Sequence, residues 1–316
     1  MKQMILQLRK TYLEKKFFRN SPYKYYNFWS IADPAEVWFS RFIEYHGLNP
    51  LKKNLNFISV FGSEFTHKLI PAPKIFFSGE DLDSSTFPKL NSYKKVQSNV
   101  DLSLGFDTAM EKNNFYLPLW FLSFIDPECS LETITAKFEA INDIKFRDDG
   151  RKKFACQVSR HDINGIREKI ILLLDSIEHV DRAGFFMNNT DDLTSLFGDR
   201  KNDFLKQYRF NICPENSDTP GYVTEKIFDS VQAGCIPIYW SEKNLSEINI
   251  FNKDAILFYD EACPEKLCNQ IADLQKNEKA YLEFISRPLF TINAPELIIA
   301  HLTKLKERLK EVINLH

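Results

Sequence analysis

One segment carries most of the fold information in this chain of 316 residues. Residues 211–240 read NICPENSDTPGYVTEKIFDSVQAGCIPIYW. Pro220 and Gly221 mark a turn in the middle of the segment, and Gly234 stands where a helix C-cap is expected. The final CIPIYW is a short apolar run typical of a buried strand. The segment therefore predicts a strand, a loop, a helix at about residues 223–234 and a second strand.

The two faces of this expected helix differ in chemistry. Val223, Ile227 and Val231 fall on one side and are expected to face a sheet. The other side carries four polar residues at i, i+3, i+4 and i+7: Tyr222, Glu225, Lys226 and Asp229. A lysine at a helix N-terminus is well placed for a phosphate, because the free N–H groups and the helix dipole already favour negative charge. A carboxylate at the same end suits ribose hydroxyls. The alternative interpretation is that Glu225 and Lys226 bind no ligand and form a solvated face of the helix, with a capping carboxylate.

Short apolar runs alternate with helical patterns on both sides of this segment. The strand-like runs of the C-terminal half are residues 154–158, 183–187 and 210–213. Those of the N-terminal half are residues 57–61, 74–77 and 102–106. Such alternation is typical of a parallel α/β sheet. The length predicts roughly two domains of about 150 residues each. We place the junction in the polar stretch at about residues 130–152, whose most hydrophilic part is RDDGRKK, and this gives domains at residues 1–150 and 151–316. The last helix, residues 295–316, is free to pack back on the N-terminal domain.

Composition excludes several classes of protein. The 41 Lys and Arg balance 43 Asp and Glu, which argues against nucleic-acid binding through bulk charge. The hydrophobic share of 44% is too high for a disordered chain. No apolar run is long enough for a transmembrane helix. The six cysteines are scattered, without the spacing of a zinc site or a disulfide framework, and are expected to be thiols in a reducing compartment.

The N-terminus, MKQMILQLRKTYLEKKFFRN, is basic and lacks the apolar core of a signal peptide. It predicts a short helix with Met4, Ile5, Leu8 and Tyr12 on one side. One interpretation is a weak peripheral contact with an anionic membrane surface. The other is a solvated basic helix packed on the protein body.

Three stretches together resemble the α1,3-fucosyltransferase family, of the bacterial type. The run CPENS…GYVTEKIFDSVQAGCIPIYW is similar to the family's donor-binding motif. FACQVSRHDINGIREKIILLLDSIE, residues 154–178, resembles its strand leading to a helix that opens with an arginine. FFSGED, residues 76–81, resembles its strand-end acid. Pro214 and the pair Trp240-Ser241 depart from the family pattern. The likeness covers about residues 55–245.

The resemblance implies a fold, a reaction and a set of roles. The fold is GT-B-like, with two Rossmann-like domains facing across a cleft. The reaction is inverting transfer of L-fucose from GDP-β-L-fucose to a hydroxyl, O3 of GlcNAc in an N-acetyllactosamine-like glycan, with no obligatory metal. Glu80 is the implied catalytic base. The implied GDP-fucose pocket consists of Arg167, Asn216, Tyr222, Glu225 and Lys226. The expected acceptor is an oligosaccharide, lipid-linked or part of a lipopolysaccharide, and the expected location is the cytoplasm or the inner membrane face.

Several alternatives stay open. Asp81-Leu82-Asp83 has the form of a DxD metal motif, although its Ser- and Thr-rich surroundings favour a polar loop. Arg167 could lie on a solvent face of its helix. Another GDP-sugar could be the donor, or the chain could be a non-catalytic nucleotide- or glycan-binding relative. No G-x-G-x-x-G after a strand, no P-loop and no G-x-S-x-G elbow occurs in the sequence, which argues against NAD enzymes, P-loop phosphotransferases and α/β-hydrolases.

Overall fold

The computed structural model describes residues 2–48, 54–83, 87–107, 112–148, 150–241, 245 and 249–315. The chain forms two compact units. Unit 1 comprises Met1–Ser130, Thr219–Tyr222 and Ile298–His316, and unit 2 comprises Leu131–Asp218 and Val223–Leu297. The charged stretch around residue 150, where the sequence placed the junction, lies within unit 2.

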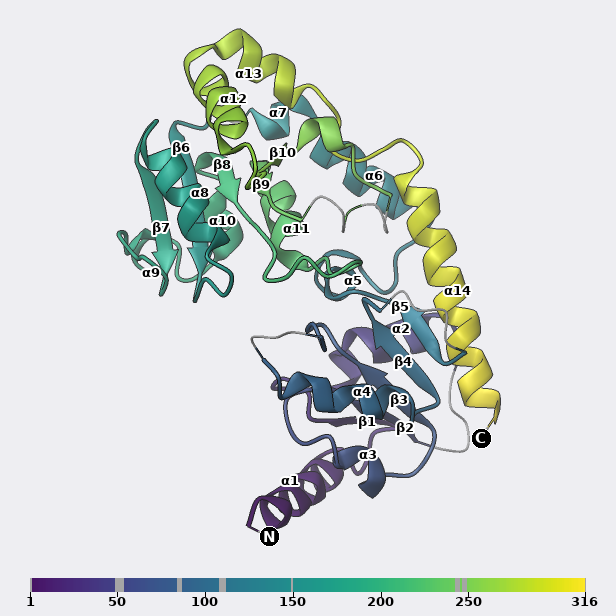
Figure 1. Ribbon diagram of the computed structural model, residues 1–316. Helices are drawn as coiled ribbons and strands as arrows, with labels where there is room; N and C mark the ends of the chain where they lie inside the picture. The colour runs from purple at the N-terminus through teal and green to yellow at the C-terminus, as the bar shows by residue number, and fades with distance from the viewer. Residues whose placement is uncertain are drawn as a thin grey trace. The chain divides into compact units, whose positions relative to one another are not determined.

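Unit 1 is built on a five-stranded parallel sheet of order β1-β2-β3-β4-β5 (Figure 1). Its strands are β1 Tyr23–Tyr26, β2 Leu55–Ile58, β3 Lys74–Phe77, β4 Leu102–Gly105 and β5 Asn114–Tyr116. Its helical segments are α1 Lys2–Phe17, η1 Pro34–Glu36, α2 Trp38–Tyr45, α3 Thr66–Leu69, η2 Leu90–Tyr93, α4 Lys94–Gln97 and α5 Leu119–Phe124. The long α14, Ala294–Leu315, contributes its residues from Ile298 onward. Strands β1 and β2 are buried throughout, as expected of a sheet covered on both faces.

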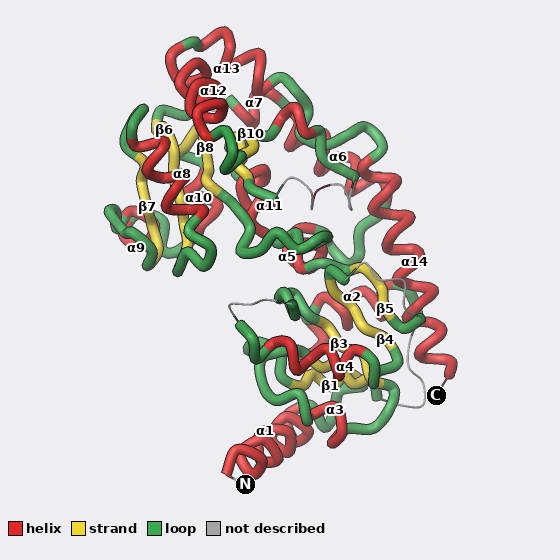
Figure 2. Tube along the Cα trace, in the orientation of Figure 1, coloured by secondary structure: helices red, strands yellow, loops and turns green. Residues whose placement is uncertain are grey.

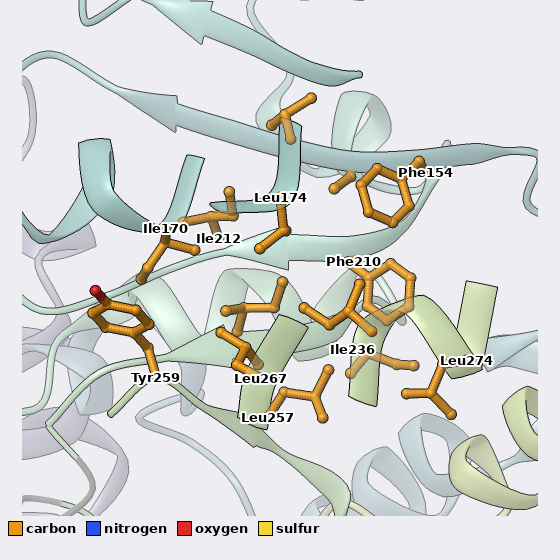
Figure 3. Close-up of a cluster of buried hydrophobic side chains, with 14 of the residues drawn as sticks. Phe154, Ile170, Leu174, Phe210, Ile212, Ile236, Leu257, Tyr259, Leu267 and Leu274 are labelled. Carbon is orange, nitrogen blue, oxygen red and sulfur yellow. The ribbon is translucent and has the colours of Figure 1, made fainter. Parts of the chain in front are cut away.

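Unit 2 contains a second five-stranded parallel sheet of order β10-β9-β8-β6-β7 (strands yellow in Figure 2). Its strands are β6 Lys153–Ser159, β7 Val180–Gly184, β8 Tyr208–Ile212, β9 Ile236–Tyr239 and β10 Leu257–Phe258. Its helical segments are α6 Leu131–Asn142, α7 Ile144–Arg147, α8 Ile166–Asp175, α9 Asp192–Ser195, α10 Lys201–Leu205, α11 Glu225–Gln232, η4 Lys253–Ala255, α12 Pro264–Lys276 and α13 Glu278–Ile285. Figure 3 shows its main core, in which apolar side chains of β6, β8, β9 and β10 meet those of α8 and α12.

The predicted α/β fold with parallel sheets is confirmed. Most strands lie within a few residues of their expected places, but the expected strand at 183–187 is β7 at Val180–Gly184. Residues 130–142, which the polar composition assigned to a junction, include α6. All six cysteines are free thiols. Among the described residues, none of the helices has the length and hydrophobicity needed to cross a membrane.

Candidate functional site

The polar residues of unit 2 gather at the carboxyl ends of two neighbouring strands. Helix α8 follows β6, and α11 follows β8, and these two strands are paired in the sheet (Figure 1). The N-termini of both helices therefore lie at the same edge of the sheet, which is where ligands bind in open α/β sheets. The loops before the helices are joined directly, because Asn164 Nδ2 donates to the backbone oxygens of Glu215 and Asn216, both at 3.3 Å.

Arg167 is buried at the start of α8, with 3% of its surface exposed. Its Nη2 donates to the backbone oxygen of Pro214 at 3.0 Å and to Asn216 Oδ1 at 2.8 Å. Its Nη1 lies 3.6 Å from Asp162 Oδ1, whose partner oxygen Oδ2 accepts the N–H of Glu168. An arginine in the first turn of a helix opposes the helix dipole, and Asp162 supplies the compensating negative charge here. The solvent-face alternative for Arg167 is therefore wrong.

Glu215 has a fully buried side chain that accepts several hydrogen bonds. Its Oε1 accepts the backbone N–H of Thr224 at 2.8 Å and the hydroxyl of Tyr239 at 3.2 Å. Its Oε2 accepts Thr224 Oγ1 at 2.8 Å and Lys226 Nζ at 3.1 Å. Both oxygens are thus satisfied by donors that belong to the start of α11 and to β9. Glu215 ties the N-terminus of α11 to the loop after β8.

Lys226 and Glu225 form the first residues of α11, after the N-cap residue Thr224. The Lys226 side chain is 18% exposed and its Nζ lies 3.9 Å from Glu225 Oε1. Burial acts to lower the pKa of Lys226, but the carboxylates of Glu215 and Glu225 outweigh it and raise the pKa above its ordinary value. Burial acts to raise the pKa of Glu225, but Lys226 and backbone hydrogen bonding outweigh it and lower the pKa. Both groups are therefore charged near neutral pH.

This arrangement can bind an anion and a polyol at one edge of the sheet. Two cationic groups, Arg167 and Lys226, stand at helix N-termini, and a partly exposed carboxylate, Glu225, stands beside the second. A phosphate or diphosphate fits the cations and the free N–H groups of α11. The structure therefore brings together four of the residues that the sequence singled out: Arg167, Asn216, Glu225 and Lys226.

Tyr222 and Glu80 belong to unit 1. The expected helix at 223–234 begins only at Glu225, so Tyr222 is not on its polar face. Instead, Tyr222 is buried and its ring lies 5.0 Å, edge to face, from that of Phe106. Glu80 is half-buried in the loop after β3. The loop is held by Ser78, whose hydroxyl accepts the N–H of Glu80 at 3.1 Å and donates to its backbone oxygen at 2.8 Å.

The two aspartates of the DxD-like stretch have protein partners. Asp81 Oδ1 accepts the N–H of Asp83 at 2.8 Å, and Asp81 Oδ2 accepts Thr219 Oγ1 at 2.6 Å. Asp83 forms an ion pair with Lys94. Within the described parts of the chain, no group of three or more His, Cys, Asp or Glu side chains is arranged to hold a metal ion.

A cavity of about 390 Å³ lies at the carboxyl ends of β3 and β4. Two of its lining residues, Ser78 and Leu82, are close to Glu80 in the chain. Ser78 and Gly105, at the ends of these strands, line it. The other polar side chains around it are those of Asp83, Lys94, Gln97, Ser98, Asp107, Asn114 and Thr219. This mixture of donors and acceptors suits a ligand rich in hydroxyl groups.

The chain has two α/β units, each built on a parallel sheet, which is the arrangement of GT-B-like proteins. Comparisons with known proteins agree with this class. The profile "Glycosyltransferase family 10 (fucosyltransferase) C-term" matches residues 148–302, and the profile "Alpha-(1,3)-fucosyltransferase FucT N-terminal domain" matches residues 23–123. The chain belongs to glycosyltransferase family 10, the fucosyltransferases.

Two curated relatives share less than 30% sequence identity with this chain. The α-(1,3)-fucosyltransferase FucT of Helicobacter pylori is 28% identical over 251 residues, which are 70% of this chain and 48% of that protein. GDP-fucose protein O-fucosyltransferase 3 of Xenopus tropicalis is 26% identical over 75% of this chain and 50% of its own length. The chain thus spans about half the length of these curated relatives. A crystal structure of an α1,3-fucosyltransferase with GDP-fucose superimposes with a TM-score of 0.58 at 23% identity, covering 90% of this chain and 89% of that one.

Sequence reasoning missed Glu215 as a member of the site. It stands directly before Asn216, which the motif did single out, but a buried carboxylate looks the same in sequence as an exposed one. The available signal was its position two residues after the end of the strand predicted at residues 210–213, in the loop that leads to the next helix. Loops after parallel strands converge at one edge of the sheet, so a carboxylate there can reach the following helix N-terminus.

Proposed function

We propose that this protein is a fucosyltransferase that moves L-fucose from GDP-β-L-fucose to a sugar hydroxyl with inversion at the anomeric carbon. The observation that carries the proposal is the position of two cations, Arg167 and Lys226, at the starts of α8 and α11. Glu225 lies beside Lys226. The names of the relatives support the donor, since one of them is a GDP-fucose protein O-fucosyltransferase and a solved relative contains GDP-fucose.

In unit 2 the proposed roles follow from charge and position. Lys226 and Arg167 bind the diphosphate, Glu225 accepts hydrogen bonds from the ribose hydroxyls, and Asn216, fixed by Arg167, lines the pocket. Cleavage of the donor leaves negative charge on the departing GDP. Cations held in place beforehand stabilise that charge without reorganisation during the reaction. Tyr222 is proposed to complete the donor pocket.

In unit 1, Glu80 is the proposed general base. It takes the proton from the acceptor hydroxyl as that oxygen attacks the anomeric carbon and the bond to GDP breaks. One displacement converts a β-linked donor into an α-linked product. We propose that the polar cavity near the ends of β3 and β4 binds the acceptor glycan. No obligatory metal is proposed, so full activity in EDTA is expected, and a strict metal requirement would contradict this part.

The first experiment is thermal unfolding of the full chain with GDP-fucose, GDP-mannose, GDP, UDP-galactose and UDP-GlcNAc. A ligand at about 100-fold excess over its Kd adds roughly 2.7 kcal/mol, which raises the Tm by about 5–10 °C for units of this size. The proposal expects a shift with GDP and GDP-fucose. A shift with GDP and GDP-mannose but not with GDP-fucose favours another GDP-sugar. No shift with any of the guanosine nucleotides overturns the proposed donor site.

The acceptor separates two candidate activities. The resemblance favours O3 of GlcNAc in an N-acetyllactosamine-like glycan, as in Lewis-type structures, and the match to a protein O-fucosyltransferase favours a polypeptide hydroxyl. Incubation with GDP-fucose and either N-acetyllactosamine or a folded protein acceptor, followed by mass spectrometry, distinguishes them. Binding of GDP-fucose with neither GDP release nor transfer to an acceptor would favour a non-catalytic relative. We also propose that the protein acts in the cytoplasm, at or near the inner membrane face, where its acceptor glycan would be built.

A further inference from the structure

Helix α1 presents its apolar residues to solvent. Between Ile5 and Arg19, the exposed apolar and aromatic residues are Ile5, Leu6, Leu8, Tyr12, Leu13 and Phe17. Tyr12 is 66% exposed and Phe17 is 59% exposed. The other exposed residues of this stretch are basic: Arg9, Lys15, Lys16 and Arg19. No exposed residue there is acidic or neutral and polar.

The opposite face of α1 is polar and packs against the rest of unit 1, beside α3 and β1 (Figure 1). Gln7 Nε2 donates to Thr66 Oγ1 at 2.7 Å, and Lys10 Nζ donates to the backbone oxygen of Phe61 at 2.8 Å. The single acid of the stretch, Glu14, accepts the backbone N–H of Asn27 at 3.0 Å. These specific bonds fix the rotation of the helix. The apolar face therefore cannot turn inward without leaving buried polar groups unsatisfied.

The exposed apolar surface continues beyond the helix. Leu13, Phe17 and Trp29 line one cavity of about 780 Å³ at the C-terminal part of α1, and Lys16 borders it. The ring of Trp29 lies 6.5 Å from that of Phe61, which is itself 52% exposed. A patch of this kind, apolar with a basic border, marks an interaction site rather than an ordinary solvent face.

The charges favour one kind of partner. Two copies of this face would bring basic side chains against basic side chains, which disfavours self-association. An anionic lipid surface matches both properties at once, because acyl chains take the apolar residues and headgroups pair with Arg and Lys. Aromatic residues such as Trp29 and Tyr12 are also suited to the boundary between headgroups and acyl chains.

We propose that the outward face of α1, together with Trp29, docks on the surface of a bilayer containing anionic lipids. The docking is peripheral and does not involve the donor site. It would hold a transferase of this family near acceptors that are themselves attached to lipid.

The test is cosedimentation of the full chain with vesicles of phosphatidylcholine alone or with about one third phosphatidylglycerol. Binding is expected only to the anionic vesicles and is expected to weaken as salt is raised. The double variant R9Q/K16Q should lower the partition coefficient about 25-fold, from two surface charges. The variant L13S/F17S should lower it by about 10-fold or more. No donor is needed, so the result is independent of the proposed function.

Matched controls lie in unit 2. F185S removes an aromatic residue that is 82% exposed, and K276Q/K279Q removes two exposed charges. Both should leave vesicle binding unchanged. The proposal is overturned by equal binding to neutral vesicles, by absent binding to anionic ones, or by control variants that lower binding equally. It is also overturned if sedimentation velocity shows a dimer that L13S/F17S dissociates while vesicles do not bind. If L13S/F17S unfolds, R9Q/K16Q decides alone.

Discussion

Glu80 and Glu215 occupy the same place in their respective units. Each is the third residue after a parallel strand, β3 in unit 1 and β8 in unit 2. Glu215 is fully buried, and its two oxygens accept hydrogen bonds from Thr224, Tyr239 and Lys226. Glu80 is half-buried, and the loop that carries it is shaped by the hydroxyl of Ser78.

The difference shows how one local position serves two purposes. A carboxylate with all its lone pairs engaged is a fixed anion that orders its neighbours, and it is poorly suited to accept a proton from a substrate. A carboxylate at the surface of a strand-end loop can meet a substrate hydroxyl. We therefore expect Glu215 to contribute to folding and to the position of Lys226, and Glu80 to contribute to turnover.

The largest expected effect tests the Glu80 side of this comparison. Glu80→Gln should lower kcat about 10²–10⁴-fold, because general-base catalysis contributes that much and an amide cannot accept the proton. GDP affinity and the free energy of unfolding should stay unchanged. Steady-state kinetics with GDP-fucose and an acceptor measures the effect, and Glu36→Gln, at an exposed acid of unit 1, is the control. Wild-type kcat in Glu80→Gln would require another base.

The next effect tests the Glu215 side. Glu215→Gln should lower the free energy of unfolding by about 3 kcal/mol, because the amide NH₂ would face Lys226 Nζ and the buried ion pair would be broken. Urea unfolding measures the change. Glu80→Gln serves as the matched variant and should stay within about 0.5 kcal/mol of the wild type. If the two variants lose equal stability, the contrast between the carboxylates is refuted.

A smaller effect concerns the cation that Glu215 holds. Lys226→Ala should weaken the binding of GDP about 10- to 100-fold, the range for a lost hydrogen bond to a charged group. Isothermal titration with GDP measures it. Lys201, which pairs with Asp229 at 2.7 Å in the same unit, offers the control, and Lys201→Ala should change GDP affinity far less. Unchanged GDP affinity in Lys226→Ala would remove its phosphate role.

The smallest effect concerns His301, a half-buried residue of unit 1 that lies outside the proposed reaction. Burial lowers the pKa of His301, which is stacked on Phe121 and contacts the Tyr116 carbonyl. The unfolded chain therefore takes up the proton first, and stability falls as the pH drops below about 6.5. His301→Gln should flatten part of the Tm change between pH 7.5 and 5.5. The exposed His161→Gln should not, and an unaltered pH dependence in His301→Gln would contradict the assignment.

Sequence patterns predicted elements well where local and tertiary preferences agree. In α14, Ile298, Leu302 and Leu309 recur at helical spacing, and all three are buried. In α1 a comparable pattern left the direction of the apolar side open, and the structure turns the polar side inward because Asn27 and Thr66 accept hydrogen bonds from Gln7. Periodicity finds a helix but does not say which face meets the protein.

Two charged residues, Arg147 and Arg151, also show that a local sequence pattern does not determine burial. The stretch around residue 150 is the most hydrophilic of its region, yet Arg147 and Arg151 are both buried. Arg147 Nη1 donates to the backbone oxygens of Ile285 and Arg287, which are remote in sequence. Burial lowers the pKa of Arg147 to about 10. Only the folded chain brings such acceptors within reach, so the hydrophilicity of the stretch does not show that these arginines are buried.

The sequence by itself determined the alternation of strands and helices, the family resemblance and the charged residues that open α8 and α11. These follow from local periodicity, turn residues and motif order, which act over a few residues. The tertiary structure decided which carboxylate is buried, that Tyr222 precedes the helix, and that the apolar face of α1 is exposed. Those outcomes depend on hydrogen bonds and packing between segments distant in the chain, and a linear pattern does not record which segments will meet.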